Sequence, residues 1–504
     1  MPARPRIELR TLLDRLSSHA DRVIVTQESK QFVRRSFPTL AQDTRTAVET
    51  LRTWGVQPGM RVGIISENSY RWLVYDLALI ELRCVSVPFP EMDVSSSDDG
   101  IFETHELNLL LVSSKFSPAD IANRPRVARM DAENLHRVQA SSAQPQRYKA
   151  RDDDHSYVMG SGTSGSRKGM IASRRGVEAI IEEYAEGFGS EETDSILVFM
   201  PLWSLQQRLF YYGALAFGID LYVVEAQDVF QAVRDLRPTI LVAPPVFYET
   251  LRQQKMTGLF GPGTRVLITG MAKSRLATLT YFREKNLPLY ELYALTETGM
   301  VSMNIPGEQR LGSVGKPVPG TDVRIADDGE ILVRKPHFQI RGYFAGVPGG
   351  PREWPNGAFW PTGDVGHFDE DGFLYVDGRK DDIITTPSGQ KVQPEAIEGP
   401  LGNSPLVRWA VILRDAEQPY MVAVIDTDQR EDADIVPRLA ALIAEVNRAL
   451  PAWARVERFC IAPEAFKPQN GMLTPNFKIN RSRVAKLFAS EIGYNVQQVN
   501  RAAD

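Results

Sequence analysis

The sequence predicts an α/β fold with a large N-terminal part and a smaller C-terminal part. Up to residue 310, short apolar runs such as 61–66 and 84–88 alternate with stretches of helical periodicity. This alternation is typical of βαβ units and largely parallel sheets. Beyond residue 310, short strands follow one another across Asp, Gly and Pro turns, which is typical of an antiparallel or barrel-like region.

Each expected element rests on its own apolar spacing. Helices are expected at 8–20, 40–53 and 69–82. Strands are expected at 61–66, 84–88, 109–112, 196–200, 221–224, 240–243, 266–269, 322–326, 329–334, 372–377, 409–413 and 420–425. The last expected helix carries Ile435, Leu439 and Ile443 on one face, as helical periodicity requires.

Composition and charge narrow the class of protein. With 504 residues, of which 43% are hydrophobic and 24% charged, the chain is expected to form roughly two to four globular domains. A net charge of -5 gives no electrostatic case for a nucleic-acid partner. The two cysteines, Cys84 and Cys460, cannot build a disulfide framework or a zinc site. Because no apolar run is long enough to span a bilayer and no signal-peptide core is present, we expect a cytoplasmic protein without a transmembrane segment.

The most informative stretch is the loop at 160–169, Gly-Ser-Gly-Thr-Ser-Gly-Ser-Arg-Lys-Gly. Its glycines let backbone N–H groups approach a ligand closely, its hydroxyls can donate hydrogen bonds, and Lys168 adds a positive charge. A polyphosphate needs these groups. The loop therefore predicts a nucleotide-binding turn that follows a strand at 155–159.

The residues around this loop fit other known nucleotide-binding motifs less well. Gly160-x-Gly162-x-x-Gly165 matches the dinucleotide-binding fingerprint, but the next residues begin a helix poorly. A Walker loop does not fit, because Lys and Ser/Thr do not follow Gly165. No His-Arg-Asp or Asp-Phe-Gly triplet indicates a protein kinase. Taken alone, the loop could equally be a surface turn.

Four further segments follow the glycine loop in a fixed order. They are Tyr-Ala-Leu-Thr-Glu at 293–297, Pro-Thr-Gly-Asp at 361–364, Gly-Arg-Lys-Asp-Asp at 378–382, and Leu-Thr-Pro-Asn-Phe-Lys at 473–478. Each alone has an ordinary structural explanation, such as a helix cap, a turn or a surface lysine. Their joint order and spacing are hard to explain by chance.

Together these segments resemble the adenylate-forming superfamily of acyl-CoA synthetases, luciferases and peptide-synthetase adenylation domains. The resemblance runs from about residue 10 to residue 490, and it is closest to the fatty acyl-CoA synthetase branch. It implies a large domain, 1–380, built of two parallel-type α/β sheets and a barrel-like β subdomain. It also implies a small, mobile α+β domain, 381–504, that rotates about a hinge at Asp381.

The resemblance implies an ATP-dependent acid–thiol ligase. A carboxylic acid of the fatty or a related class would be activated with ATP and Mg²⁺ as an acyl-adenylate. It would then be transferred to coenzyme A, with release of AMP and pyrophosphate. A phosphopantetheinyl carrier protein is the alternative thiol partner.

The resemblance also assigns roles to residues. The phosphate loop would comprise Ser161, Gly162, Thr163, Ser164, Gly165 and Lys168. Adenine and ribose would contact Gly270, Met271, Ala272, Tyr293, Asp364 and Arg379. Thr296 would hold the α-phosphate, Glu297 would bind Mg²⁺, and Lys478 would bridge the attacking carboxylate and the α-phosphate. The loop Ser388, Gly389 and Gln390 would line the thiol tunnel.

The chain departs from the family pattern around the expected acyl pocket. Ser204 occupies the position of a gating His, Gln207 replaces an acid, and Leu292 and Ala294 replace glycines. The expected pocket walls are Trp203, Ser204, Phe210, Tyr211, Met271, Leu292 and Ala294. Plain core packing explains the large apolar residues among these equally well.

These departures keep alternatives open. One is an enzyme that loads a carrier protein, and another is a specialist that converts only acyl-adenylate to thioester. A third, from another class, is a nucleotide-binding protein without catalysis. An NAD-dependent oxidoreductase requires every motif after residue 170 to be coincidence. Fatty, aryl and polyketide-like acids all remain candidate substrates.

Overall fold

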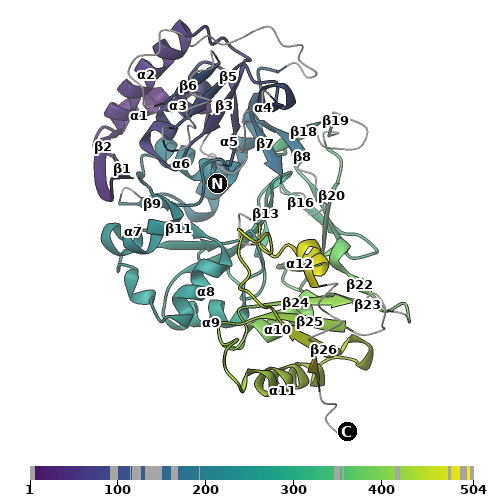
Figure 1. Ribbon diagram of the computed structural model, residues 1–504. Coiled ribbons are helices and arrows are strands. Elements are labelled where there is room, and N and C mark those ends of the chain that lie inside the picture. The colour runs from purple at the N-terminus through teal and green to yellow at the C-terminus, as the bar shows by residue number, and fades with distance from the viewer. Residues whose placement is uncertain are drawn as a thin grey trace.

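In the computed structural model (Figure 1), the chain is described over residues 6–90, 100–113, 115, 126–130, 150–160, 168–191, 193–345, 352–354, 357–386, 388–414, 421–474, 478–488 and 497–499. Two large sheets and a smaller β sheet form the N-terminal domain, and a smaller α+β domain lies below them. Among the described residues, no helix is both long and apolar enough to cross a membrane.

The first large sheet has the order β15-β14-β13-β12-β11-β9-β10-β1-β2. Its strands are β1 (Val23–Glu28), β2 (Gln31–Ser36), β9 (Ser195–Val198), β10 (Asp220–Val223), β11 (Ile240–Ala243), β12 (Val266–Thr269), β13 (Leu289–Leu295), β14 (Gly299–Met303) and β15 (Lys316–Pro317). The strands from β1 across β10, β9, β11 and β12 to β13 pair in parallel. Both edges are antiparallel, so the predicted parallel core is confirmed and the sheet as a whole is mixed.

The second large sheet has the order β19-β18-β8-β7-β4-β3-β5-β6. Its strands are β3 (Arg61–Ile65), β4 (Val85–Pro88), β5 (Leu109–Val112), β6 (Val127–Arg129), β7 (Asp154–Gly160), β8 (Lys168–Ser173), β18 (Ile340–Ala345) and β19 (Arg352–Glu353). The residues at 160–169 join β7 to the antiparallel strand β8. The loop therefore connects two strands of a hairpin, whereas the dinucleotide fingerprint requires a strand followed by a helix.

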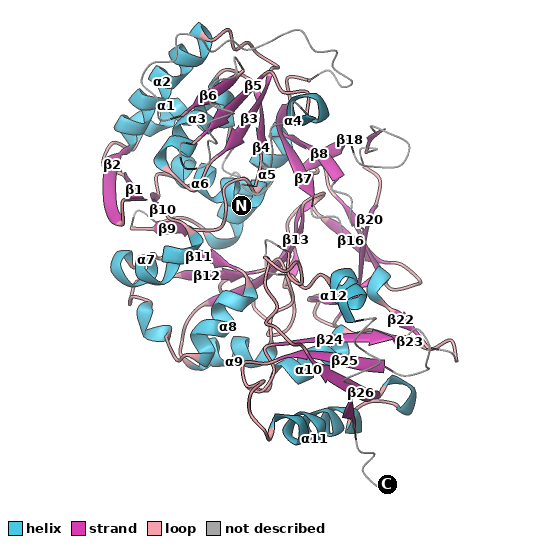
Figure 2. Ribbon diagram, viewed as in Figure 1, coloured by secondary structure: helices cyan, strands magenta, loops and turns pink. Residues whose placement is uncertain are grey.

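Helices cover the faces of these sheets (Figure 2). They are α1 (Leu12–Ser18), α2 (Phe37–Thr53), α3 (Tyr70–Glu81), α4 (Gly100–Thr104), α5 (Arg174–Phe188), α6 (Leu205–Phe217), α7 (Val229–Leu236), α8 (Pro245–Gln253) and α9 (Leu276–Glu284). Serine side chains cap three of them: Ser36, Ser69 and Ser173 accept hydrogen bonds from backbone N–H groups of the first turns of α2, α3 and α5. Such caps satisfy donors that the helix itself leaves unpaired.

The smaller β sheet of the N-terminal domain is antiparallel throughout. It consists of β16 (Asp322–Ile325), β17 (Glu330–Arg334), β20 (Trp360–Phe368) and β21 (Leu374–Arg379). The predicted antiparallel region beyond residue 310 is thereby confirmed. Strand β20 was not expected, because its Pro, Thr, Gly and Asp residues are typical of a turn; pairing with β17 and β21 decides its conformation instead.

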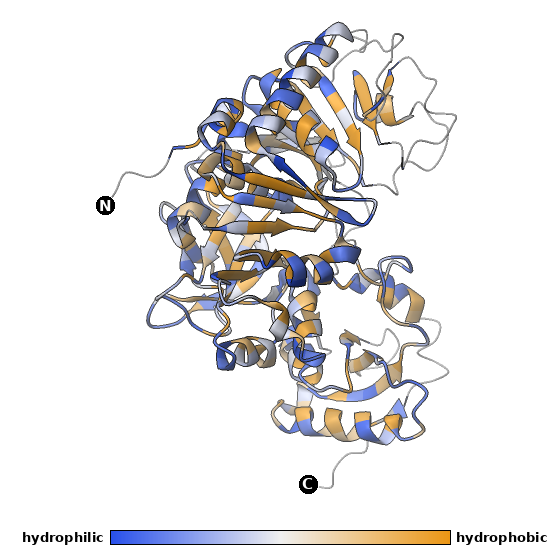
Figure 3. Cartoon of the chain, turned by 90° about the vertical axis from the view of Figure 1, so that its left-hand side faces the viewer, coloured by the Kyte–Doolittle hydropathy of each residue, from blue (hydrophilic) through white to orange (hydrophobic). Residues whose placement is uncertain are grey.

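The C-terminal domain has a core of its own. Its elements are β22 (Ile384–Thr385), β23 (Lys391–Val392), α10 (Glu395–Gly402), β24 (Trp409–Arg414), β25 (Met421–Asp426), α11 (Ile435–Arg448), β26 (Val456–Ile461), α12 (Arg481–Phe488) and β27 (Gln497–Gln498). Ile435, Leu439 and Ile443 of α11 pack into this core, as the spacing predicted. In Figure 3 the central strands of both domains are largely apolar.

A buried polar network ties the N-terminal domain together. The fully buried carboxylate of Asp76 on α3 accepts hydrogen bonds from Tyr211, from Tyr212 (2.6 Å) and from Arg208 Nη1 (3.2 Å), all on α6. Arg208 Nη2 also donates to Ser156 Oγ on β7 (2.6 Å). Burial raises the pKa of both tyrosines well above the usual value of 10. They therefore remain protonated donors to the carboxylate.

Replacing Asp76 with Ala should destabilise this domain strongly, because the change leaves the Arg208 cation buried without its carboxylate. We expect a loss of about 3–5 kcal/mol in the free energy of unfolding, measured by chemical denaturation. In the matched control Glu49→Ala, which removes the surface pair with Arg52, the loss should stay below about 1 kcal/mol. Equal losses in the two variants would contradict the role of the network.

Candidate active site at the junction of the two domains

The centre of the candidate site is the carboxylate of Asp364 on β20. Tyr293 Oη, at the end of β13, donates to Asp364 Oδ2 (2.5 Å), and Arg379 Nη1, the cross-strand neighbour on β21, donates to Oδ1 (2.9 Å). The backbone N–H of Asp364 donates to Thr362 Oγ1 (3.0 Å). Three strands from two sheets therefore fix one carboxylate, and each of its oxygens keeps a further lone pair for a ligand.

The surroundings of Asp364 keep these donors in their donating forms. Burial, and then the negative charge of Asp364, raises the pKa of Tyr293 well above the usual value of 10. The left-handed backbone of Gly363 (φ 74°) is open to glycine and disfavoured for other residues. A Cβ atom at this position would also lie 3.4 Å from Arg379 Nη2. Glycine therefore lets the strand turn beside the arginine.

Lys478 of the C-terminal domain extends to this centre. Desolvation by the surrounding protein atoms is the main cause that lowers its pKa below the usual value, although part of the residue is exposed. The charges that act on it are Asp364 and Glu297, which raise the pKa, and Arg379, which lowers it. The structure therefore brings together residues from β20, β21, the β13–β14 turn and the small domain.

Two hydrogen bonds with Thr474 hold the backbone of Lys478 in place. The Thr474 N–H donates to the Lys478 carbonyl (2.7 Å), and the Lys478 N–H donates to Thr474 Oγ1 (3.1 Å). This reciprocal pair closes a turn in front of α12. Residues 475–477 of the predicted motif lie outside the described residues.

Thr296 and Glu297 lie in the turn between β13 and β14. Thr296 is exposed and Glu297 half-buried, and the Glu297 carbonyl accepts from the Ile340 N–H (3.0 Å). The ordinary explanation of this pair as a helix cap is wrong, because a strand follows it.

Among the described residues, no group of three His, Cys, Asp or Glu side chains could by itself hold a metal ion.

The Gly270-Met271-Ala272 segment follows β12 directly. Met271 has a left-handed backbone (φ 70°), a conformation that costs free energy in a residue other than glycine and that concentrates at functional sites. Gly270 is buried, and a Cβ atom there would lie 2.8 Å from Leu292 Cδ1. Leu292 thus packs directly against this segment.

Five of the seven expected acyl-pocket residues lie in or against one hydrophobic core. Phe210, Tyr211 and Leu292 are buried in it, while Trp203 and Ala294 are half-buried at its edge. Phe210 packs edge-on against Tyr184, with ring centroids 5.0 Å apart. Tyr211 holds Asp76, so its hydroxyl has a structural role. Ser204 is half-buried directly before α6, and its side chain makes no cap to that helix.

The other predicted residues are described in part or lie on the surface. Ser161, Gly162, Thr163, Ser164 and Gly165 are outside the described residues, and of Lys168 only the backbone, paired with Gly160, is described. Ser388, Gly389 and Gln390 are exposed at the tip of the β22–β23 hairpin. Asp381 is exposed in a short 3₁₀ turn, Lys380–Asp382, between the two domains.

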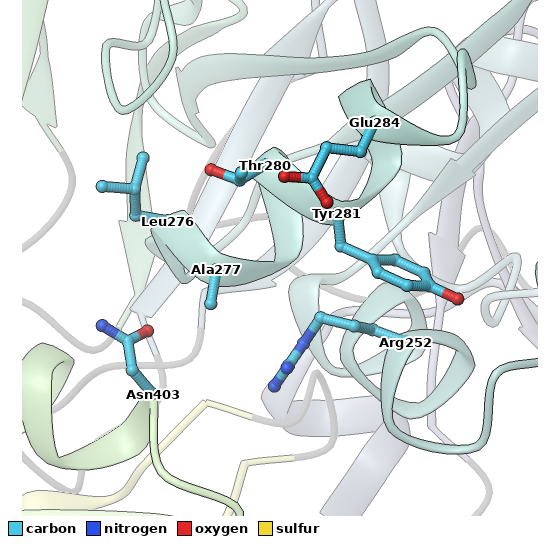
Figure 4. Close-up of a pocket in the computed structure, with 7 residues that line it drawn as sticks. All are labelled: Arg252, Leu276, Ala277, Thr280, Tyr281, Glu284 and Asn403. Atoms are coloured by element: carbon cyan, nitrogen blue, oxygen red, sulfur yellow. The ribbon is translucent and has the colours of Figure 1, made fainter.

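A cavity of about 420 Å³ lies elsewhere on the domain junction (Figure 4). Its lining residues are Arg252, Leu276, Ala277, Thr280, Tyr281, Glu284 and Asn403. All but Asn403 belong to α8 and α9. None of the predicted site residues lines this cavity, so it is distinct from the Asp364 centre.

Glu291 is a functional-site neighbour that the sequence analysis missed. Its side chain is buried on β13, and hydrogen bonds from Ser274 tie it to the segment after β12. Burial raises the pKa of this carboxyl from 4.5 to about 7. An acidic residue inside an apolar strand was the signal available in the sequence.

This raised pKa predicts a pH dependence of stability. In the unfolded chain Glu291 releases its proton near pH 4.5, whereas the folded protein keeps the proton up to about pH 7. Its contribution to stability should therefore fall as the pH rises from about 4.5 to 7. We expect Glu291→Gln to flatten this part of the profile, measured as unfolding free energy at graded pH. An identical slope in wild type and variant would contradict the assignment.

Comparisons with known proteins identify the family of this chain. The pattern of the AMP-binding enzyme family matches residues 13–344, and that of the AMP-binding enzyme C-terminal domain matches residues 381–498. A long-chain-fatty-acid–CoA ligase of Mycobacterium bovis is 27% identical, over 90% of each chain. A 2-succinylbenzoate–CoA ligase of Bacillus velezensis is also 27% identical, over 61% of this chain and 65% of its own.

Solved structures share the fold. An anthranilate CoA ligase in complex with anthranoyl-AMP superposes with a TM-score of 0.78 at 18% identity, covering 97% of this chain and 98% of that one. The o-succinylbenzoate CoA synthetase of Bacillus subtilis, in complex with its acyl-adenylate, gives 0.77 at 20% identity, covering 95% and 98%. The chain belongs to the AMP-binding enzyme family, whose adenylate-forming members include acyl-CoA ligases.

Proposed function

We propose that this protein is an AMP-forming acid–thiol ligase that activates a fatty or related carboxylic acid and transfers it to coenzyme A. The observation that carries the proposal is that Lys478, from the small domain, lies near enough to Asp364 and Glu297 of the large one for both negative charges to act on its ammonium group. A purely nucleotide-binding protein has no need for a lysine delivered by a second domain. The relative that aligns over 90% of this chain is named a long-chain-fatty-acid–CoA ligase, which supports the acyl class.

The anchored Asp364 suits a ribose. Its two oxygens, already oriented by Tyr293 and Arg379, each have room to accept one of the neighbouring ribose hydroxyls. The ring of Tyr293 and the backbone of 270–272 would flank the adenine. The loop 161–168, with Thr163 as donor and Lys168 as charge, would wrap the β- and γ-phosphates.

In the first half-reaction a carboxylate attacks the α-phosphorus of ATP, so two negatively charged groups that repel each other must be brought together. One of its oxygens forms the new P–O bond while pyrophosphate leaves. Lys478, as an ammonium, would neutralise charge on both reacting groups, and Thr296 would hold the α-phosphate. Positioning and electrostatic stabilisation of this kind account for most of the rate in such transfers.

The residues also fit a Mg²⁺ ion. Magnesium prefers one or two carboxylates together with phosphate oxygens and water. Glu297 is such a carboxylate, half-buried and near Lys478. When bound, the ion would neutralise phosphate charge.

The second half-reaction requires Lys478 to leave. We propose that the small domain, 381–504, rotates about Asp381, as hinges at exposed element ends allow. Rotation would bring Ser388, Gly389 and Gln390 to the site as a tunnel for the thiol. The thiolate then attacks the acyl carbonyl and AMP departs, leaving a thioester. A carrier protein's phosphopantetheine is the alternative acceptor.

The test is pyrophosphate release from ATP and Mg²⁺ across graded fatty and aryl acids, with and without coenzyme A. We expect release with one class of acid and faster turnover with coenzyme A. If no acid gives release, synthetic acyl-adenylates are supplied and thioester is measured. Thioester formation there would favour the half-reaction specialist, to which the Ser204 and Gln207 departures point, and its absence would overturn the ligase.

Lys478→Ala should separate the two half-reactions. We expect acyl-adenylate formation to fall by at least about 100-fold, because the attacking and leaving groups lose their neutralising charge. Thioester formation from supplied acyl-adenylate should be unchanged. Lys467→Ala, which removes an exposed lysine of the same domain, is the matched control. An equal loss of both half-reactions in Lys478→Ala would refute the assigned role.

A further inference from the structure

A second junction between the domains lies away from the hinge, at the start of α9. Arg275 is the N-cap residue of this helix, and its Nη2 donates to the backbone carbonyl of Arg408 (2.5 Å), directly before β24 of the small domain. A hydrogen bond from a charged donor is stronger than one between neutral groups. This bond therefore ties the small domain to the large one.

The guanidinium of Arg275 is oriented from within the large domain. Its Nη1 donates to Glu249 Oε1 on α8 (3.0 Å), and the side chain is only 17% exposed. Glu249 is itself held by Arg252 and by Thr278 Oγ1 (both 2.5 Å). The donor that points at the small domain is thus fixed before the domains meet.

The small domain is shaped to receive this group. Gly402, at the end of α10, is buried, and a Cβ atom there would lie 2.9 Å from Arg275 Nε and 3.1 Å from Cζ. The guanidinium therefore packs against bare backbone. Beside it the cavity of about 420 Å³ separates α9 from Asn403, and Leu276 remains 54% exposed (Figure 4). The Arg275 contact therefore joins the two domains at the edge of this cavity, apart from the hydrogen bond that Gln393 Nε2 donates to the Arg379 carbonyl beside the hinge (3.3 Å).

We propose that Arg275 is a positioning residue that latches the small domain in the orientation that places Lys478 at the Asp364 centre. This inference rests on the proposed function. The latch supports acyl-adenylate formation and must open before the thiol can enter. Arg275 touches no reacting group, so it acts through the pose of the small domain.

The latch also adjoins the nucleotide segment. Residues 270–272 are followed by Lys273, by Ser274, whose Oγ lies 3.3 Å from Thr269 Oγ1, and then by Arg275. The segment proposed to contact the nucleotide and the residue that holds the small domain therefore belong to one short stretch of backbone.

The first test measures the pose and needs no acid. Spin labels on Gln254→Cys and Ala441→Cys, both exposed positions on opposite domains, report the interdomain distance by pulsed electron resonance. The native Cys84 and Cys460 are buried. With ATP and Mg²⁺ bound, we expect one dominant distance in the parent and a broadened distribution in Arg275→Ala. Identical distributions would overturn the latch, whatever the substrate proves to be.

The second test measures the half-reactions with the acid that gives most pyrophosphate release. Arg275→Ala should lower the kcat of acyl-adenylate formation by about tenfold, the factor that corresponds to about 1.4 kcal/mol, with little change in the KM for ATP. Thioester formation from the matching acyl-adenylate should be unchanged or faster. Arg275→Lys should rescue in part, because one ammonium cannot reproduce both ends of the fork. Arg283→Ala, an exposed arginine on the same helix, should match the wild type.

A second variant separates the latch from the fold of the large domain. Gly402→Ala pushes against the guanidinium from the small domain and leaves the Glu249 contacts in place. It should reproduce both effects of Arg275→Ala in weaker form. Loss of both half-reactions in either variant, or of neither, would overturn the proposal. Absence of pyrophosphate release in the wild type would instead refute the ligase, and the distance measurement would still decide the latch.

Discussion

The fixed carboxylate of Asp364 is the constraint on which the site depends. Tyr293 comes from the first large sheet, while Asp364 and Arg379 are neighbours in the antiparallel sheet, so their two hydrogen bonds join two layers of the large domain. Arg379 is followed at once by the 3₁₀ turn that leads into the small domain. The carboxylate that is proposed to bind the ribose is therefore next to the proposed hinge, and its negative charge acts on Lys478. In this account, moving this carboxylate would disturb ribose binding, the hinge and the lysine together.

The small domain contributes chemistry through its position. The backbone of Lys478 is held by hydrogen bonds with Thr474, and the residue is partly exposed. In the proposed mechanism it becomes part of the site only when the domains meet. The exposed tip at 388–390 lies on a different part of the small domain, at the end of the β22–β23 hairpin. A rotation that exchanges these two surfaces would let one site serve both half-reactions in turn, as the proposed reaction requires.

The sequence predicted the parallel cores well because their strands are continuous apolar runs, such as 240–243 and 266–269. Such runs can be recognised as buried strands without knowing which strands they pair with. It failed where pairing decides the conformation. Strand β20 has the residues of a turn, and Thr296 and Glu297 have those of a helix cap, yet tertiary pairing makes the first a strand and the second a hairpin turn. The motif residues Tyr293, Asp364 and Arg379 were found by their order, but the hydrogen bond of the Tyr293 hydroxyl was not. Neither were Glu291 and Arg275. Glu291 was signalled only by its acidic side chain within an apolar strand, and a single polar residue at an interdomain position, such as Arg275, forms no pattern along the chain.

The most direct measurement is the affinity of AMP and of 3′-deoxy-AMP for the wild type and for Asp364→Ala, by titration calorimetry. If the anchored carboxylate accepts the ribose hydroxyls, loss of the 3′-hydroxyl should weaken binding to the wild type by about tenfold, as expected for a hydrogen bond to a charged group. The same loss should leave binding to Asp364→Ala unchanged, because the acceptor is already gone. An equal penalty in both proteins would contradict the account, since the ribose would then be held elsewhere.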